Sequence, residues 1–257
     1  MIQFRILHQD DAFVAIDKPA GFQVHAPEDP KRRISNDTNC LYLLRRQIEK
    51  YLYPVHRIDR ATSGVVLYAL TPDAAREISR QFQEKEVRKT YFAVTRGWTP
   101  AEGRIEHPLK SEHDEAVKKE SLTSYARIGQ LELPVPNGPH PTSRYSLVRA
   151  EPHSGRMHQL RRHFAHLSHP LIGDTVYGDG KHNRVFRELL DERALFLKAY
   201  SITFTHPVSG QKIAIHARWN HLWHRIFDLF GICPYSSSEP TSQTWIPCPR
   251  AKTTGRG

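Results

Sequence analysis

The spacing of apolar residues predicts that the chain begins with β-structure and then changes to a helix. Residues 4–7 and 13–16 are short apolar runs with the composition of strands, and the polar segment between them predicts a hairpin. In residues 39–53 the apolar positions recur at helical spacing, with charged side chains between them. This segment is predicted to be an amphipathic helix.

The middle of the chain is predicted to be mostly β. Residues 64–70 (GVVLYAL) form a nearly continuous apolar run, short enough for a buried strand. Thr71 and Pro72 then provide an N-cap and a proline in the first helical turn, with Ala75, Ile78 and Phe82 facing inward. Residues 90–95, 122–128 and 145–150 are predicted strands.

The pattern after residue 133 alternates loops, strands and helices without a repeat. Four prolines and an Asn-Gly pair make residues 133–141 an exposed loop. Residues 156–167 and 219–230 have helical spacing, and residues 195–205 and 212–216 are predicted strands. The irregular order favours an α+β domain with a mixed, mainly antiparallel sheet. Residues 1–230 are predicted to form this domain, and residues 231–257 have the composition of a flexible tail.

The charge of the chain indicates a polyanionic partner. Its 257 residues include 37 Lys and Arg against 27 Asp and Glu, a formal net charge of +10. Nucleic acid is the first candidate, although some soluble proteins are simply basic. We expect a cytoplasmic protein, because three dispersed cysteines favour a reducing compartment and neither a secretory signal nor a membrane-spanning run is found.

Residues 56–64 (HRIDRATSG) place one acid among cationic residues directly before the buried strand. The arginines would favour the ionised form of Asp59, which suits a nucleophile, while facing phosphates themselves. The alternative from the residues alone is a surface loop of ion pairs.

A second basic cluster, residues 155–163 (GRMHQLRRH), lies at a predicted helix start. It could bind phosphates or pair one arginine with Asp59, or be a solvated helix face. Its histidines, with His166 and His169, raise the question of a metal, but no metal-binding spacing accompanies them. Tyr91 lies inside a predicted strand, where packing is the simplest role.

Five motifs in order along the chain resemble those of the RluA-type pseudouridine synthase family, which modifies ribosomal and transfer RNA. They are residues 17–21 (DKPAG), 56–64, 89–93 (KTYFA), 155–161 and 169–174 (HPLIGD), followed by His206-Pro207. Ile58 and Met157 stand where the family usually has Leu and Thr or Ser. The resemblance is strongest to a branch that acts on uridine 65 of tRNA.

This resemblance implies a curved sheet with flanking helices, a central catalytic cleft and no cofactor or metal. It implies that Asp59 attacks the nucleoside, that Arg161 pairs with Asp59, and that Tyr91 stacks on uracil and takes part in proton transfer. Arg57 matches an arginine that fills the space of the flipped base. The predicted RNA-binding residues are His56, Arg57, Arg60, Arg156, His158 and Gln159.

The resulting expectation is a monomeric enzyme that isomerises uridine in tRNA, without a membrane or metal partner. A synthase acting on ribosomal RNA and a non-catalytic RNA-binding protein or RNA chaperone on the same fold are the alternatives. A metal-dependent RNA hydrolase would depend on the histidines alone.

Overall fold

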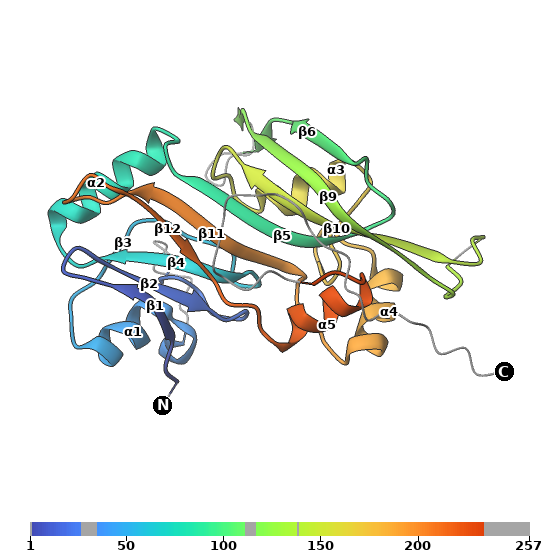
Figure 1. The fold of residues 1–257 in the computed structure, drawn as a ribbon, viewed down its shortest axis with the longest axis horizontal. Helices are drawn as coiled ribbons and strands as arrows, with labels where there is room; N and C mark the ends of the chain where they lie inside the picture. The colour runs from blue at the N-terminus through green and yellow to red at the C-terminus, as the bar shows by residue number, and fades with distance from the viewer. Residues whose placement is uncertain (1, 27–34, 111–116, 138, 234–257) are drawn as a thin grey trace.

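A computed structural model describes residues 2–26, 35–110, 117–137 and 139–233 of the chain. Within these ranges a ten-stranded sheet has a main path of β1-β2-β4-β11-β5-β10-β9-β6, with β3 beside β4 and β12 beside β11 (Figure 1). Its strands are β1 (Arg5–Gln9), β2 (Phe13–Lys18), β3 (Tyr53–Pro54), β4 (Ser63–Ala69), β5 (Arg88–Arg96), β6 (Glu102–Glu106), β9 (Leu122–Leu133), β10 (Ser143–Pro152), β11 (Leu197–Thr205) and β12 (Lys212–His216).

Five α-helices and a small second sheet flank this sheet in the described part of the chain. The helices are α1 (Cys40–Ile48), α2 (Pro72–Gln83), α3 (Gln159–His166), α4 (Gly180–Leu190) and α5 (His221–Leu229), and a 3-10 turn covers Asn36–Thr38. The short strands β7 (Leu109–Lys110) and β8 (Lys118–Lys119) pair with each other. The predicted α+β architecture with a mainly antiparallel sheet is confirmed, since β4 and β11 form the one parallel pair among the described strands.

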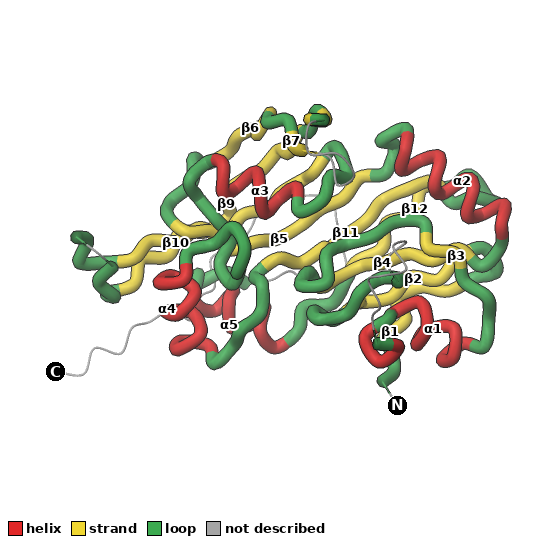
Figure 2. The backbone as a smooth tube through the Cα atoms, turned by 180° about the vertical axis from the view of Figure 1, so that it is seen from behind, coloured by secondary structure: helices red, strands yellow, loops and turns green. Residues whose placement is uncertain are grey.

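Alternation along β2 and β4 explains why helices cover both faces of the sheet. Phe13 and Ala15 point to one face and pack with Ala74 and Ile78 of α2. Val14 and Ile16 point to the opposite face and pack with Leu43, Leu44 and Cys40 of α1. Figure 2 shows the chain from behind, with α1 and α3 in front of the sheet at opposite ends.

The structure corrects the helix predicted for residues 39–53, which ends at Ile48. Glu49 has a left-handed backbone (φ 53°), and Tyr53 then pairs with Ala69 in the sheet. Pro54 disfavours a helical conformation at Tyr53. Leu52 occupies the core as the pattern predicted, but from a loop. The helix α4 and the edge strand β6 were not predicted.

The C-terminal boundary remains a prediction. Ile232 is buried against the core beside α5, so the described chain is still packed there. Residues 234–257 of the expected tail lie outside the described residues. Among the helices that are described, none has the length and apolarity needed to cross a lipid bilayer.

Candidate active site

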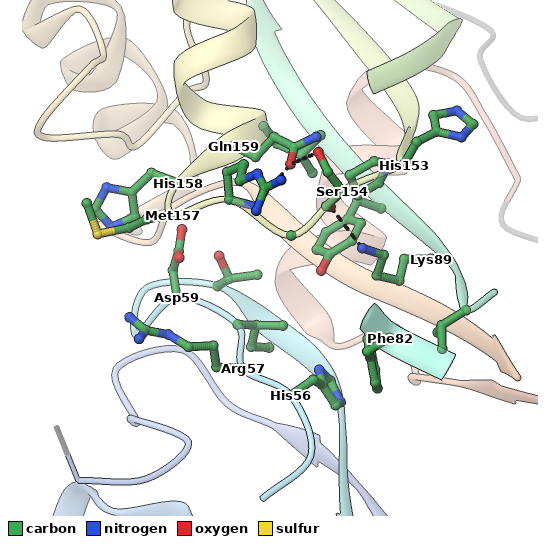
Figure 3. Close-up of a pocket in the computed structure, with 18 of the residues that line it drawn as sticks. His56, Arg57, Asp59, Phe82, Lys89, His153, Ser154, Met157, His158 and Gln159 are labelled. Atoms are coloured by element: carbon green, nitrogen blue, oxygen red, sulfur yellow. Dashed lines mark hydrogen bonds between the residues drawn. The ribbon is translucent and has the colours of Figure 1, made fainter. Parts of the chain in front are cut away.

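A cleft of about 530 Å³ opens on the sheet beside β5. One wall is formed by residues 55–59 and Thr62, in the segment between β3 and β4, and the opposite wall by residues 152–160, which lead into α3. Figure 3 shows side chains from both walls, among them Asp59, Ser154 and His158, together with Lys89 of β5. The two basic motifs of the sequence therefore face each other across one cavity.

A buried lysine holds the segment that carries Asp59. Lys18 is fully buried, and its Nζ donates hydrogen bonds to the carbonyls of Pro19 (3.0 Å), Phe22 (2.8 Å) and Arg60 (3.3 Å). Arg60 is tied further to Gly21 by two hydrogen bonds of 2.8 Å, one in each direction. Because these contacts fix the residue after Asp59, the motif at residues 17–21 positions the loop at 56–64.

Gly64 sets the spacing between this loop and the centre of the sheet. Its φ of 126° lies in the region that favours glycine, and a Cβ there would meet the carbonyl oxygen of Ala199 at 2.0 Å. Gly64 pairs with Ala199 where β4 runs parallel to β11. Only a residue without a side chain allows the two backbones to approach so closely.

Arg161 lies between two carboxylates. Its Nε and Nη2 donate to Asp174 at 2.7 and 2.8 Å, while its Nη1 lies 3.6 Å from Oδ2 of Asp59. The predicted pairing of Arg161 with Asp59 is confirmed, but the tighter pairing with Asp174 was not foreseen. The feature of the sequence that could have indicated this pairing is the aspartate that ends the motif at residues 169–174.

Asp174 is charged although it is buried. Burial opposes its ionisation, but hydrogen bonds from Arg161 and from the backbone amides of Tyr177 and Val176 outweigh burial and lower its pKa. A buried arginine that donates two hydrogen bonds to one carboxylate has a guanidinium group of fixed orientation. Asp59 thus faces a guanidinium whose orientation is fixed by another residue.

Tyr91 lies on β5, and its side chain lines the same cleft. Burial, and secondly the negative charge of Asp59, raise the pKa of its phenol above the usual value. The phenol is therefore neutral at neutral pH. It offers a ring for stacking and a hydroxyl proton for donation.

The predicted RNA-binding arginines take three different positions. Arg57 is exposed and lines the cleft beside Asp59 (Figure 3). Arg156 lines the opposite wall, and its buried Nε has no hydrogen-bond partner among the described residues. Arg60 is exposed but does not line the cleft, and its Nε is occupied by Gly21.

His56 and Gln159, which were predicted to contact RNA, make hydrogen bonds within the protein. Nε2 of His56 accepts from the Leu67 amide at 2.9 Å, and its ring stacks on Phe82. Burial, with the nearby charge of Lys89, lowers the pKa of His56 to about 3, so this ring is neutral. The amide of Gln159 accepts from the Ser154 hydroxyl and the Arg156 amide, and donates to Leu122 and Thr123. Both residues hold the walls in place, and RNA contact by them stays a prediction.

The histidines around α3 have protein partners. His158 has a left-handed backbone (φ 53°) and places Nδ1 3.1 Å from the Tyr177 hydroxyl, at the cleft. His163 is fully buried between Thr123 and the carbonyl of His107, and His166 stacks on His107. Within the described residues, no group of three or more His, Cys, Asp or Glu is arranged to hold a metal ion.

Comparisons with known proteins agree with the geometry. Residues 12–166 match the family model described as RNA pseudouridylate synthase. The chain is 40% identical over 234 residues to tRNA pseudouridine synthase C of Vibrio vulnificus (strain CMCP6), covering 88% of this chain and 94% of that protein. It is 41% identical over 234 residues to the protein of the same name from Pasteurella multocida (strain Pm70), covering 88% and 95%.

Two solved structures share the fold. Human RNA Pseudouridylate Synthase Domain Containing 4 superimposes with a TM-score of 0.67 at 22% identity, over 88% of this chain and 92% of that chain. Human RNA Pseudouridylate Synthase Domain Containing 1 gives 0.64 at 21% identity, over 88% and 94%. At these identities the likeness supports the architecture of the sheet and its helices.

Proposed function

Since the chain belongs to the RNA pseudouridylate synthase family, whose members are isomerases that act on RNA, we propose that it converts uridine 65 of tRNA to pseudouridine with Asp59 as nucleophile. Relatives at about 40% identity that carry a tRNA-specific name support tRNA as the substrate. The position within tRNA comes from the resemblance of the motifs. We expect the enzyme to act as a monomer.

The observation that carries the proposal is the position of Asp59. Its carboxylate lines the cleft, 3.6 Å from a buried arginine and on a loop fixed by Lys18. A carboxylate held in this way faces a fixed cation and loses little freedom on reaction, and both properties suit a nucleophile. Tyr91 provides the ring against which uracil would stack.

The proposed reaction rearranges bonds within one nucleotide. The Asp59 carboxylate bonds to C1′ as the N1–C1′ bond breaks, and uracil leaves as an anion that stays in the cleft. After uracil turns, C5 bonds to C1′ and displaces Asp59. The proton on C5 is then lost and N1 gains one. No electron or group is exchanged with another molecule, so the proposal includes neither a cofactor nor a metal.

Tyr91 is the candidate for proton transfer from C5. Because its raised pKa keeps the phenol protonated, it can accept that proton only while it passes its own to water or to the substrate. The hydroxyl is therefore proposed as a relay, and the ring as a stacking surface.

A uridine in a base-paired stem must leave the helix to reach Asp59, at a cost of a few kcal/mol. Arg57, exposed at the cleft two residues before Asp59, is proposed to occupy the vacated space. Arg156 on the opposite wall, with the net charge of +10, is proposed to attract the phosphates around it.

The experiment is tritium release from tRNA that carries C5-labelled uridine, followed by mapping of the modified position. Wild-type protein should release tritium and modify position 65. Asp59→Asn should release none, yet bind tRNA within a few-fold of wild type, since phosphate contacts dominate affinity. Asp73→Asn, on the exposed side of α2, should behave as wild type. Turnover by a verified Asp59→Asn protein would remove Asp59 from the nucleophile's role.

A further inference from the structure

Lys89 is a cation in the cleft without a carboxylate partner. It lines the cavity two residues before Tyr91 and is half-buried, and Figure 3 shows it directed toward Ser154. Its Nζ donates to the carbonyl of Ser154 at 2.9 Å, and it forms no ion pair with any described carboxylate. An ammonium has three donors, so this contact leaves two for another acceptor.

The surroundings of Lys89 do not balance its charge. His56 beside it is neutral, because its pKa is lowered to about 3, and Tyr91 is a neutral phenol. Burial lowers the pKa of Lys89 itself to about 8. A half-buried cation next to neutral groups is stabilised by any anion that enters the cleft.

We propose that Lys89 binds a backbone phosphate next to the flipped uridine. This inference depends on the proposed function, because it assumes that a nucleotide enters the cleft. Side chains two residues apart on a strand share a face at a separation of about 6.6 Å. If Tyr91 stacks on uracil, Lys89 therefore lies on the same face of the sheet, at a distance from the base comparable to that between a base and its own backbone phosphate. The charge of a nucleotide is on its phosphate, whereas uracil is neutral.

Arg57 lies near the other end of the cleft, beside Asp59, while Lys89 lies toward Phe82 and His56 (Figure 3). The two cations would therefore contact the RNA at different points. Arg57 would occupy the space that the base has left, and Lys89 would hold the strand of the nucleotide that has entered. Such a contact favours the flipped state over the paired one, since the phosphate reaches Lys89 only when the nucleotide is in the cleft.

The test uses single methylphosphonates, which remove the charge of one phosphate, in an RNA hairpin that contains the target uridine. Binding is measured in an Asp59→Asn background, so that no turnover occurs. We expect one methylphosphonate beside the target to weaken binding about tenfold, the size of a charge-assisted hydrogen bond. Lys89→Met should weaken binding of the unmodified hairpin by a similar factor. This variant should bind the methylphosphonate hairpin as tightly as it binds the unmodified one.

Three controls separate this role from others. Lys212→Met, at an exposed position on β12, should still discriminate against the methylphosphonate, and Lys89→Arg should restore the discrimination. With an abasic target nucleotide the effect of Lys89→Met should persist. The proposal is overturned if Lys89→Met discriminates against the methylphosphonate hairpin as strongly as its parent does. Lys89→Gln replaces this variant if Lys89→Met does not fold. The proposal is also overturned if the effect of Lys89→Met on binding disappears with the abasic target. Tritium release by the wild-type protein from the same hairpin tests the proposed function separately.

Discussion

Arg161 and Asp174 form a buried two-point ion pair, at 2.7 and 2.8 Å, which leaves the Nη1 of Arg161 facing Asp59 at 3.6 Å. The side chain of Asp174 is fully buried and that of Arg161 is 7% exposed. Two hydrogen bonds fix the plane of the guanidinium, and so the direction of its remaining nitrogen. Asp174 thus positions the cation that faces Asp59 without lining the cleft itself.

Asp174→Asn should therefore reduce both stability and rate. It leaves a buried guanidinium without its full partner, for which we expect a loss of about 3 kcal/mol in the free energy of unfolding. The single-turnover rate should fall by roughly tenfold to a hundredfold as Arg161 loses its orientation. Urea denaturation and tritium release measure the two effects.

The matched control is Asp179→Asn, which alters a half-exposed ion pair with Arg96. Asp179 is also the N-cap of α4, where asparagine serves as well as aspartate, and exposed ion pairs contribute about 1 kcal/mol or less. Equal losses in the two variants would contradict the positioning role of Asp174.

Tyr91→Phe should lower the rate of the chemical step and leave RNA affinity nearly unchanged. The ring that would stack on uracil remains, whereas the hydroxyl proposed as a proton relay is lost. General acid–base contributions of this kind are about 10² to 10⁴-fold in rate. Single-turnover kinetics and filter binding distinguish the effects, with Tyr200→Phe, outside the cleft, as the control. A wild-type rate in Tyr91→Phe would exclude the relay.

The arginines should share a response to salt but differ in their effect on stability. Arg57→Ala and Arg156→Ala each remove a cleft cation, which should flatten the slope of log K against log salt by about 0.7–0.9. Arg60→Ala should in addition lower the melting temperature, because its Nε holds the carbonyl of Gly21. Filter binding across a salt series provides the slopes. Arg76, exposed on α2, serves as the control, and unchanged slopes for the cleft variants would place the RNA-binding surface elsewhere.

Stability should fall in mild acid because His163 is buried in its neutral form. Burial lowers its pKa to about 4 in the folded protein, whereas an unfolded histidine titrates near 6.5. Between these values the unfolded chain binds a proton that the folded chain does not, so the free energy of unfolding decreases as pH falls from about 6.5 to 4 and levels off below.

The expected contribution of His163 over this range is up to about 3 kcal/mol. Urea denaturation at several pH values should show a steeper dependence for wild type than for His163→Gln, and His224→Gln, on the exposed side of α5, should match wild type. Equal pH dependence in wild type and His163→Gln would show that this ring does not control acid stability.

Local sequence patterns were sufficient for most of the sheet and for the Asp59 loop, since caps, periodicity and motifs are encoded in neighbouring residues. Thr71 caps α2 as predicted, and its hydroxyl accepts from the Ala74 amide. The pairing of Arg161 with Asp174 and the internal role of Gln159 depend on contacts between segments, which periodicity does not report. The end of α1 was mispredicted because Leu52 keeps the apolar spacing of a helix while its backbone has already left it.

The position of β11 determines when the site can exist during synthesis. The strands β4 and β5, which are consecutive long strands in the chain, are separated in the sheet by β11. The loop of Asp59 and the strand of Tyr91 therefore reach their final spacing only after residues 197–205 have left the ribosome and inserted between them. Contacts of such long sequence separation form slowly. The motifs at residues 17–21, 56–64 and 89–93 are thus already synthesised while the ribosome adds more than a hundred further residues, and only then can the active site form.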